Sequence, residues 1–140
     1  ARKRAMVAKV SEALEDRLAG RRIAVLGVTF KPNTDDMRDA PSLTIVPALI
    51  GAGAEVRVTD PQGRKEGAAL LPGVAWCDDA YEAAEEADAL VILTEWNEFR
   101  ALDLDRLARS MRGRVMVDLR NVYLPEDARA AGFAYASVGR

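Results

Sequence analysis

The 140-residue chain contains no histidine and only one cysteine, Cys77. Zinc sites and activated serine or cysteine nucleophiles usually depend on histidine, and a single thiol cannot form a disulfide within the chain. No apolar run approaches the ~20 residues that a membrane-spanning helix needs, and no basic block interleaved with aromatic residues favours nucleic acid. We therefore expect a cytoplasmic protein without a metal site, a nucleic-acid partner or a membrane segment.

Lysine is scarce as well, since only four of the 20 basic residues are lysine and the other 16 are arginine. The lysines are Lys3, Lys9, Lys31 and Lys65. A lysine kept in such an arginine-rich chain indicates a position that needs a compact ammonium group, although chance explains any single position equally well. The remaining composition, 49% hydrophobic and 30% charged with a net charge of −2, is ordinary for one soluble globular domain.

Strand and helix patterns alternate along the chain. Unbroken apolar runs are typical of strands buried on both faces of a parallel sheet, and they occur at 23–28, 55–59, 89–94, 114–118 and, more weakly, 133–135. Helical spacing of apolar residues predicts helices at 3–18, 42–52, 81–87, 104–111 and 125–131. We expect Gly20 to end the first helix, Ser42 to cap the second and Pro125 to begin the last. This order predicts a doubly wound parallel sheet in a three-layer αβα arrangement, with an additional N-terminal helix.

Polar and charged side chains follow the predicted strands at their carboxyl ends, where open parallel sheets bind ligands. These segments are 29–38, 60–61, 95–97 and 118–121. Gly27 stands alone, so the first turn lacks the G-x-G-x-x-G pattern whose glycines let the backbone approach a pyrophosphate. Side chains must then bind the anion, and the first loop offers Lys31 and Arg38 near the start of a helix. The sequence predicts a phosphate-bearing ligand at this edge.

Each of these polar residues also has a purely structural interpretation. A lone lysine such as Lys31 is most often a solvated loop residue. Arg38 lies among three aspartates and can form salt bridges within its loop, and Arg120 can form a buried ion pair with Asp118. Asp60 precedes a proline, so we favour an Asp-Pro turn over a ribose ligand at that position.

The remaining candidates are more readily explained by packing. Trp96 and Phe99 are expected in the core or at an interface rather than in a base-stacking platform. Cys77 lies in a short apolar run, with no histidine or lysine beside it in the sequence that would lower its pKa. We expect Cys77 to be an inert small hydrophobic residue.

The loop at 30–42 (FKPNTDDMRDAPS) resembles the F-K-x-x-T-x-D-x-R-x-(S/A)-P-(S/A) loop of the UDP-glucose/GDP-mannose dehydrogenase family. The resemblance extends along the whole chain, through the segments 52–56, 59–61, 94–96 and 117–121 and the closing G-F-x-Y-x-S-x-G-R segment at 132–140. It is closer to the UDP-glucose branch than to the GDP-mannose or UDP-N-acetylmannosamine branches. One departure is Leu119, where many relatives carry glycine before the arginine.

The resemblance implies an enzyme that oxidises the C6 alcohol of UDP-glucose to a carboxylate with two molecules of NAD, through a thiohemiacetal on a cysteine. In this family an N-terminal domain binds NAD and carries that cysteine, and a C-terminal Rossmann-like domain binds UDP. This chain is similar to the C-terminal domain, at 19–140, preceded by the end of a helical region at 1–18. The NAD-binding glycines and the cysteine segment have no counterpart here, so the resemblance implies no catalytic residue and no dehydrogenase activity for this chain alone.

The same resemblance assigns roles to single residues. Phe30, Lys31 and Arg120 would contact the UDP-sugar, and Arg38 would reach NAD held by the other domain. The implied partners are UDP-glucose, the NAD domain of the same polypeptide and further copies of the chain in a homo-oligomer. Three other hypotheses stay open: a stand-alone nucleotide-binding or regulatory module, the same domain of a GDP-mannose or UDP-N-acetylmannosamine dehydrogenase, and a domain that chiefly mediates oligomerisation through Trp96 and Phe99.

Overall fold

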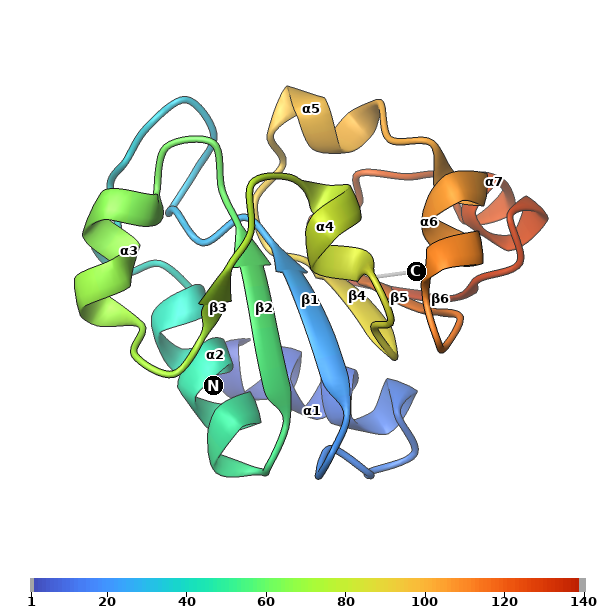
Figure 1. The fold of residues 1–140 in the computed structure, drawn as a ribbon, viewed down its shortest axis with the longest axis horizontal. Helices are drawn as coiled ribbons and strands as arrows, with labels where there is room; N and C mark the ends of the chain where they lie inside the picture. The colour runs from blue at the N-terminus through green and yellow to red at the C-terminus, as the bar shows by residue number, and fades with distance from the viewer. Residues whose placement is uncertain (1, 139–140) are drawn as a thin grey trace.

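A six-stranded parallel sheet forms the centre of the molecule (Figure 1). The computed structural model describes residues 2–138, so Ala1 and the last two residues of the closing motif, Gly139 and Arg140, lie outside the described residues. The strand order is β3-β2-β1-β4-β5-β6, which is the order of doubly wound nucleotide-binding sheets. The strands are β1 (Arg22–Leu26), β2 (Glu55–Thr59), β3 (Ala75–Trp76), β4 (Ala89–Ile92), β5 (Val115–Asp118) and β6 (Ala134–Ser137). The predicted fold class is confirmed.

Helices cover both faces of the sheet. They are α1 (Arg2–Ala13), α2 (Ser42–Gly51), α3 (Arg64–Leu70), α4 (Ala80–Ala84), α5 (Asn97–Arg100), α6 (Leu104–Ser110) and α7 (Pro125–Ala130). Successive residues of β1 alternate between two apolar cores, because Ile23 packs with α1 and α2 whereas Ala24 packs with α4 and α6. Figure 1 shows α1 behind the sheet and α4 in front of it. The chain therefore buries both faces of its sheet with its own helices.

Three elements were not predicted, and each is short. The strand β3 has only two residues, which is too few to produce an apolar run. The helix α5 is a single turn, and α3 contains a glycine that lowers its helical propensity. Packing explains this glycine, since a Cβ atom at Gly67 would lie 2.6 Å from Cη2 of Trp76. The sheet accordingly has six strands where five were expected.

Two predicted helix boundaries are wrong. The first helix ends at Ala13, before Gly20, because Glu15 and Asp16 adopt left-handed backbone angles and the Asp16 amide donates to the Ser11 carbonyl at 2.8 Å. Ser42 does not cap α2 but lies inside its first turn, where its hydroxyl donates to the Val28 carbonyl at 2.6 Å. That bond attaches α2 to the end of β1. The expected start of the last helix at Pro125 is confirmed.

The N-terminal helix shares the core of the sheet. Met6 and Val10 of α1 are buried in the same apolar cluster as Ile45 and Leu49 of α2. The proposed boundary between residues 1–18 and 19–140 stays a prediction. No helix within residues 2–138 is long and apolar enough to cross a membrane.

The aromatic residues and the cysteine belong to the interior. Trp96 and Phe99 are 5% and 1% exposed and pack in the core, which confirms the core alternative and argues against the alternative in which these two rings form a subunit interface. Cys77 is also buried, and burial raises the pKa of its thiol despite a hydrogen bond from Arg57. The interpretation of Cys77 as a packing residue of the core is confirmed, and its inertness stays a prediction.

Buried Tyr123 predicts a loss of stability at alkaline pH. Its hydroxyl donates to the Phe99 carbonyl and accepts from the Leu102 amide, and burial raises its pKa to about 12. In the unfolded chain the phenol ionises near pH 10, so ionisation favours the unfolded state between about pH 10 and 12. We expect the wild type to lose about 2 kcal/mol across this window beyond what Tyr123→Phe loses. Urea unfolding at several pH values measures this difference. The same loss of unfolding free energy between about pH 10 and 12 in both proteins would contradict it.

Candidate functional site

Three residues predicted to bind one ligand line the same cavity. Phe30 and Lys31 follow β1, and Arg120 follows β5, yet all three line a cavity of about 310 Å³ at the carboxyl edge of the sheet. The strand order explains this, because β1 and β5 lie on either side of β4 and run parallel to it. Their carboxyl ends therefore face the same edge. The structure brings these residues together as predicted, and their role in binding stays a prediction.

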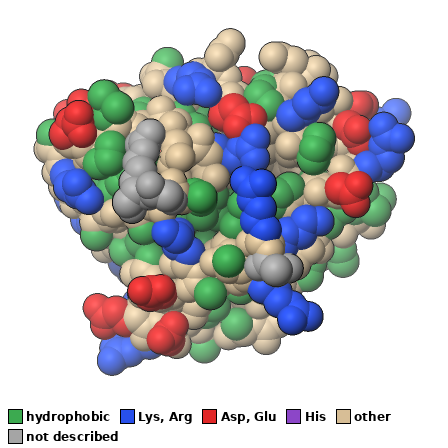
Figure 2. All heavy atoms as spheres, turned by 180° about the vertical axis from the view of Figure 1, so that it is seen from behind, with side chains coloured by type: hydrophobic (Ala, Val, Ile, Leu, Met, Phe, Trp, Pro, Cys, Tyr) green, Lys and Arg blue, Asp and Glu red, His purple; other side chains and the backbone are tan. Residues whose placement is uncertain are grey.

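Positive charge dominates this cavity. Its lining contains Arg2, Lys3, Lys31 and Arg120, with Asp39 as the acidic residue. Within residues 2–138, neither Arg2, Lys3 nor Lys31 forms an ion pair. Figure 2 shows Lys and Arg side chains gathered in the middle of the face on which α1 lies. An anion bound here would relieve the mutual repulsion of these cations.

Sequence reasoning missed the contribution of α1 to this cavity. The basic start of the chain, Arg2-Lys3-Arg4, was a visible signal, but its place relative to the sheet depends on tertiary packing. Met6 lies one turn further along α1, is buried in the core and also lines the cavity. Packing of Met6 thus brings the first turn of α1, with Arg2 and Lys3, to the cavity.

Arg120 is held by a carboxylate that the sequence analysis did not pair with it. Its Nε donates to Oε2 of Glu95 at 2.6 Å, and both side chains are only partly exposed. The alternative interpretation, an ion pair between Arg120 and Asp118, is wrong, because that carboxylate instead accepts the backbone amides of Arg120, Val122 and Tyr123. Asp118 therefore shapes the backbone of this turn, while Glu95 fixes the guanidinium.

Asp60 anchors the start of the loop that carries Lys31. Its Oδ1 accepts the amides of Gln62 and Gly63 at 3.0 and 2.8 Å, which confirms the Asp-Pro turn. Its Oδ2 accepts the amides of Val28 and Thr29 at 2.8 and 3.1 Å. The carboxylate is thus occupied by protein donors at the point where a dinucleotide fold would use it for a ribose.

Gly27 serves a close packing contact rather than a phosphate cradle. Its φ angle is +88°, and an added Cβ atom would lie 2.4 Å from Cβ of Thr94. The Thr94 side chain fills the space beside the glycine, and its hydroxyl donates to the Thr29 carbonyl at 2.8 Å. The turn after β1 is therefore built for internal hydrogen bonds.

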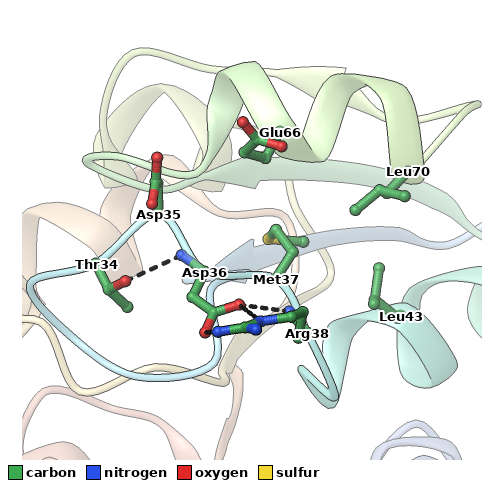
Figure 3. A pocket seen from close by; sticks show the side chains of 8 residues that line it. All are labelled: Thr34, Asp35, Asp36, Met37, Arg38, Leu43, Glu66 and Leu70. Atoms are coloured by element: carbon green, nitrogen blue, oxygen red, sulfur yellow. Dashed lines mark hydrogen bonds and ion pairs between the residues drawn. The ribbon is translucent and has the colours of Figure 1, made fainter.

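Arg38 lies on a second cavity, separate from the one lined by Lys31. This cavity has a volume of about 670 Å³ and lies between the β1–α2 loop, α2 and α3. Figure 3 shows Arg38 turned onto Asp36, with Leu43 of α2 and Leu70 of α3 on the other side. The two charged groups lie 3.0 Å apart, and the hydrogen bond from Arg38 lowers the pKa of Asp36. The salt-bridged interpretation of this loop is confirmed for this pair, although the Arg38 side chain remains 90% exposed.

A third cavity, of about 810 Å³, lies at the opposite, amino edge of the sheet. Arg17, Arg21 and Arg112 line it. Arg112 donates twice to buried Asp88, at 3.0 and 2.6 Å, and this contact lowers the pKa of that carboxyl. The charge of Arg112 is thus largely balanced within the fold. Residues 2–138 contain no cluster of three or more histidine, cysteine, aspartate or glutamate side chains able to hold a metal ion.

Comparison with known proteins gives a consistent match. Residues 24–125 match the family described as UDP-glucose/GDP-mannose dehydrogenase family, UDP binding domain. The chain is 55% identical over 139 residues to the UDP-glucose 6-dehydrogenase of Rhizobium meliloti, a match that covers 99% of the chain and 32% of that protein. The chain thus spans about a third of the length of this relative.

Solved structures of related enzymes share the fold. The NDP-N-acetyl-D-galactosaminuronic acid dehydrogenase from Methanosarcina mazei superposes with a TM-score of 0.85 at 31% identity, covering 99% of this chain and 29% of that one. The UDP-D-ManNAc dehydrogenase from Pyrococcus horikoshii gives a TM-score of 0.81 at 30% identity, covering 99% and 31%. These similar structures come from enzymes with different nucleotide sugars in their names.

Proposed function

Since this chain belongs to the UDP-glucose/GDP-mannose dehydrogenase family as its UDP-binding domain, we propose that it holds the UDP-glucose substrate of an NAD-dependent UDP-glucose 6-dehydrogenase. In that reaction UDP-glucose is oxidised to UDP-glucuronate with two molecules of NAD. The sugar assignment follows the 55% identity to a UDP-glucose 6-dehydrogenase. The NAD domain of the same polypeptide is the partner that completes the active site.

The observation that carries this proposal is the convergence of Lys31 and Arg120 on one cavity. They are far apart in the sequence and follow two different strands, but both line the same cavity at the carboxyl edge. A diphosphate between them would accept hydrogen bonds from a compact ammonium group on one side and a planar guanidinium on the other. Phe30, which is 45% exposed, supplies an apolar surface at the same cavity. A nucleoside diphosphate sugar has a diphosphate for the two cations and ring surfaces that can pack on Phe30.

The proposed contact between this chain and NAD is limited to one exposed residue. Thr94 fills the space beside Gly27, and protein donors occupy Asp60, so the turn after β1 offers neither a pyrophosphate cradle nor a ribose acceptor. Arg38 is the exposed cation that would contact NAD held by the preceding domain. NAD supplies the hydride acceptor for the oxidation, and this chain would contribute one charged contact to it.

We expect Arg38→Ala, in the complete dehydrogenase, to raise KM for NAD about tenfold and KM for UDP-glucose by less than about twofold. The reason is that Arg38 and Lys31 line separate cavities. Steady-state kinetics with each substrate varied in turn measures the two constants. Arg64→Ala, which removes another exposed arginine from a surface ion pair, is the matched control. An unchanged NAD dependence with a lower melting temperature would mean that Arg38 only braces its loop.

The 140-residue chain by itself is expected not to reduce NAD in the presence of UDP-glucose. Hydride transfer needs the nicotinamide held close to the sugar carbon, and the proposal places the groups that hold it in another domain. Cys77 is buried beneath the surface with a raised pKa, which disfavours a thiolate nucleophile. Absorbance at the NADH wavelength measures turnover, and activity that Cys77→Ser abolished would contradict this expectation.

Calorimetric titration of the chain with UDP, UDP-glucose and GDP-mannose tests the proposed function. We expect UDP and UDP-glucose to bind, and GDP-mannose to bind at least about tenfold more weakly, which corresponds to about 1.4 kcal/mol. Saturable binding of GDP-mannose alone would reassign the nucleotide. No binding of any of the three would overturn the proposal.

A further inference from the structure

We propose that the tripeptide Thr94-Glu95-Trp96 positions both halves of the UDP-binding cavity and so sets the gap between Lys31 and Arg120. This inference rests on the proposed function. It assigns a role to the Thr94-Glu95-Trp96 motif, which is not among the residues proposed to contact the ligand. Successive side chains of the tripeptide contact different sides of the cavity. Thr94 and Trp96 contact the residue that begins the Lys31 loop, whereas Glu95, between them, contacts Arg120.

Thr94 and Trp96 fix the chain just before Lys31. The Thr94 hydroxyl donates to the Thr29 carbonyl at 2.8 Å, and the Trp96 indole Nε1 lies 3.3 Å from both the Thr29 hydroxyl and Oδ2 of Asp60. Thr29, Thr94 and Trp96 are all buried, so these bonds are shielded from water. Since Thr29 is two residues before Lys31, the position at which this loop leaves the sheet is closely constrained.

Glu95 fixes the other side of the cavity. Its Oε2 accepts the Nε hydrogen of Arg120 at 2.6 Å. Within residues 2–138, the terminal guanidinium nitrogens of Arg120 donate no hydrogen bond. This monodentate contact leaves the two terminal nitrogens for a diphosphate while it orients the plane of the guanidinium.

The sheet order explains why this single tripeptide can serve both sides. It follows β4, which pairs with β1 on one side and with β5 on the other. An extension of β4 is therefore flanked by the β1 extension with Lys31 and by the β5 extension with Arg120. A ligand that spans the two cations gains affinity when they are already held at the right separation.

Calorimetry with UDP and UMP as probes tests this role. We expect Glu95→Ala to weaken UDP binding about tenfold and UMP binding by less than about threefold, because the gap matters most to a ligand with two phosphates. Glu95→Gln keeps an acceptor for Nε and should bind UDP within about twofold of wild type. Thr94→Val, which loses the hydroxyl, should weaken UDP binding more than Thr94→Ser, which keeps it. Circular dichroism of each variant reports whether the fold is intact.

The outcomes distinguish the positioning role of the tripeptide from the proposed binding of UDP. If wild type binds UDP and Glu95→Ala binds it equally well, the positioning role is wrong and the proposed function stands. If Glu95→Ala and Glu95→Gln both bind UDP more tightly, Glu95 acts only by repelling phosphate, and the inference is again wrong. If wild type binds no UDP, the proposed function fails and this inference fails with it. Loss in Glu95→Ala with rescue in Glu95→Gln supports the inference.

Discussion

Replacing Arg120 with alanine is expected to weaken UDP-glucose binding by about 1.5–3 kcal/mol, or roughly ten- to a hundredfold. The guanidinium is held by Glu95 at the edge of a partly enclosed cavity, where charge-assisted hydrogen bonds are stronger than in open solvent. Arg120 forms no part of the apolar cores, so the fold should remain intact. Calorimetry beside circular dichroism measures both quantities.

Lys31→Ala should weaken binding by a similar factor, and Lys31→Arg should restore it only in part. The cavity of about 310 Å³ is already lined by the guanidinium groups of Arg2 and Arg120, which limits the room for a third planar group at position 31. Lys65→Ala, an exposed lysine on α3 outside this cavity, is the matched control and should bind as wild type does. Undiminished affinity in both Lys31→Ala and Arg120→Ala would end the case for this site.

Asp60→Ala is expected to lower the free energy of unfolding by about 3–5 kcal/mol. The carboxylate is 8% exposed and accepts four backbone amides from the ends of β1 and β2. Its removal leaves several buried donors without an acceptor, and water reaches them poorly. Urea unfolding measures the loss.

A surface aspartate provides the control for this variant. Asp78 forms an ion pair with Arg64, and its side chain is 84% exposed, so Asp78→Ala should change stability by less than about 0.5 kcal/mol. Because Asp60 also fixes the start of the Lys31 loop, the folded fraction of Asp60→Ala should bind UDP more weakly. A stability loss below about 1 kcal/mol would mean that water replaces the carboxylate.

The strands and the ligand edge could be predicted from the sequence because both depend on local patterns. An unbroken apolar run such as 89–94 identifies a buried parallel strand, and parallel strands necessarily direct their carboxyl ends to one edge. The gathering of Phe30, Lys31 and Arg120 at one cavity followed from that rule and from the family resemblance. The resemblance, rather than periodicity, supplied the nucleotide and the division of roles.

Side-chain partners could not be predicted, because they depend on tertiary distances. Asp118 was the nearest acidic residue to Arg120 in the sequence, yet the backbone turn takes its carboxylate and leaves Arg120 to Glu95. Likewise, Ser42 has the chemistry of a helix cap, but the nearby Val28 carbonyl takes its hydroxyl hydrogen. In both places a backbone group forms the hydrogen bond that the sequence assigns to a different partner.

The β1–α2 loop links two cavities with separate proposed ligands. Lys31 lines the cavity assigned to the UDP-sugar, and Arg38, seven residues later, lines the cavity assigned to the NAD side. The amide of Phe30 donates to the Asp36 carbonyl at 2.8 Å, so the two halves of the loop are joined by a backbone hydrogen bond. One loop can therefore hold the two ligands in a fixed relation.

A crystal structure of the chain with UDP tests the central claim most directly. We expect the diphosphate in the cavity lined by Phe30, Lys31 and Arg120, with phosphate oxygens about 2.7–3.2 Å from the Lys31 ammonium and the Arg120 guanidinium. The contact between Arg120 and Glu95 should persist in that complex. A diphosphate bound beside Arg38, or at the amino edge between Arg17 and Arg112, would contradict the account.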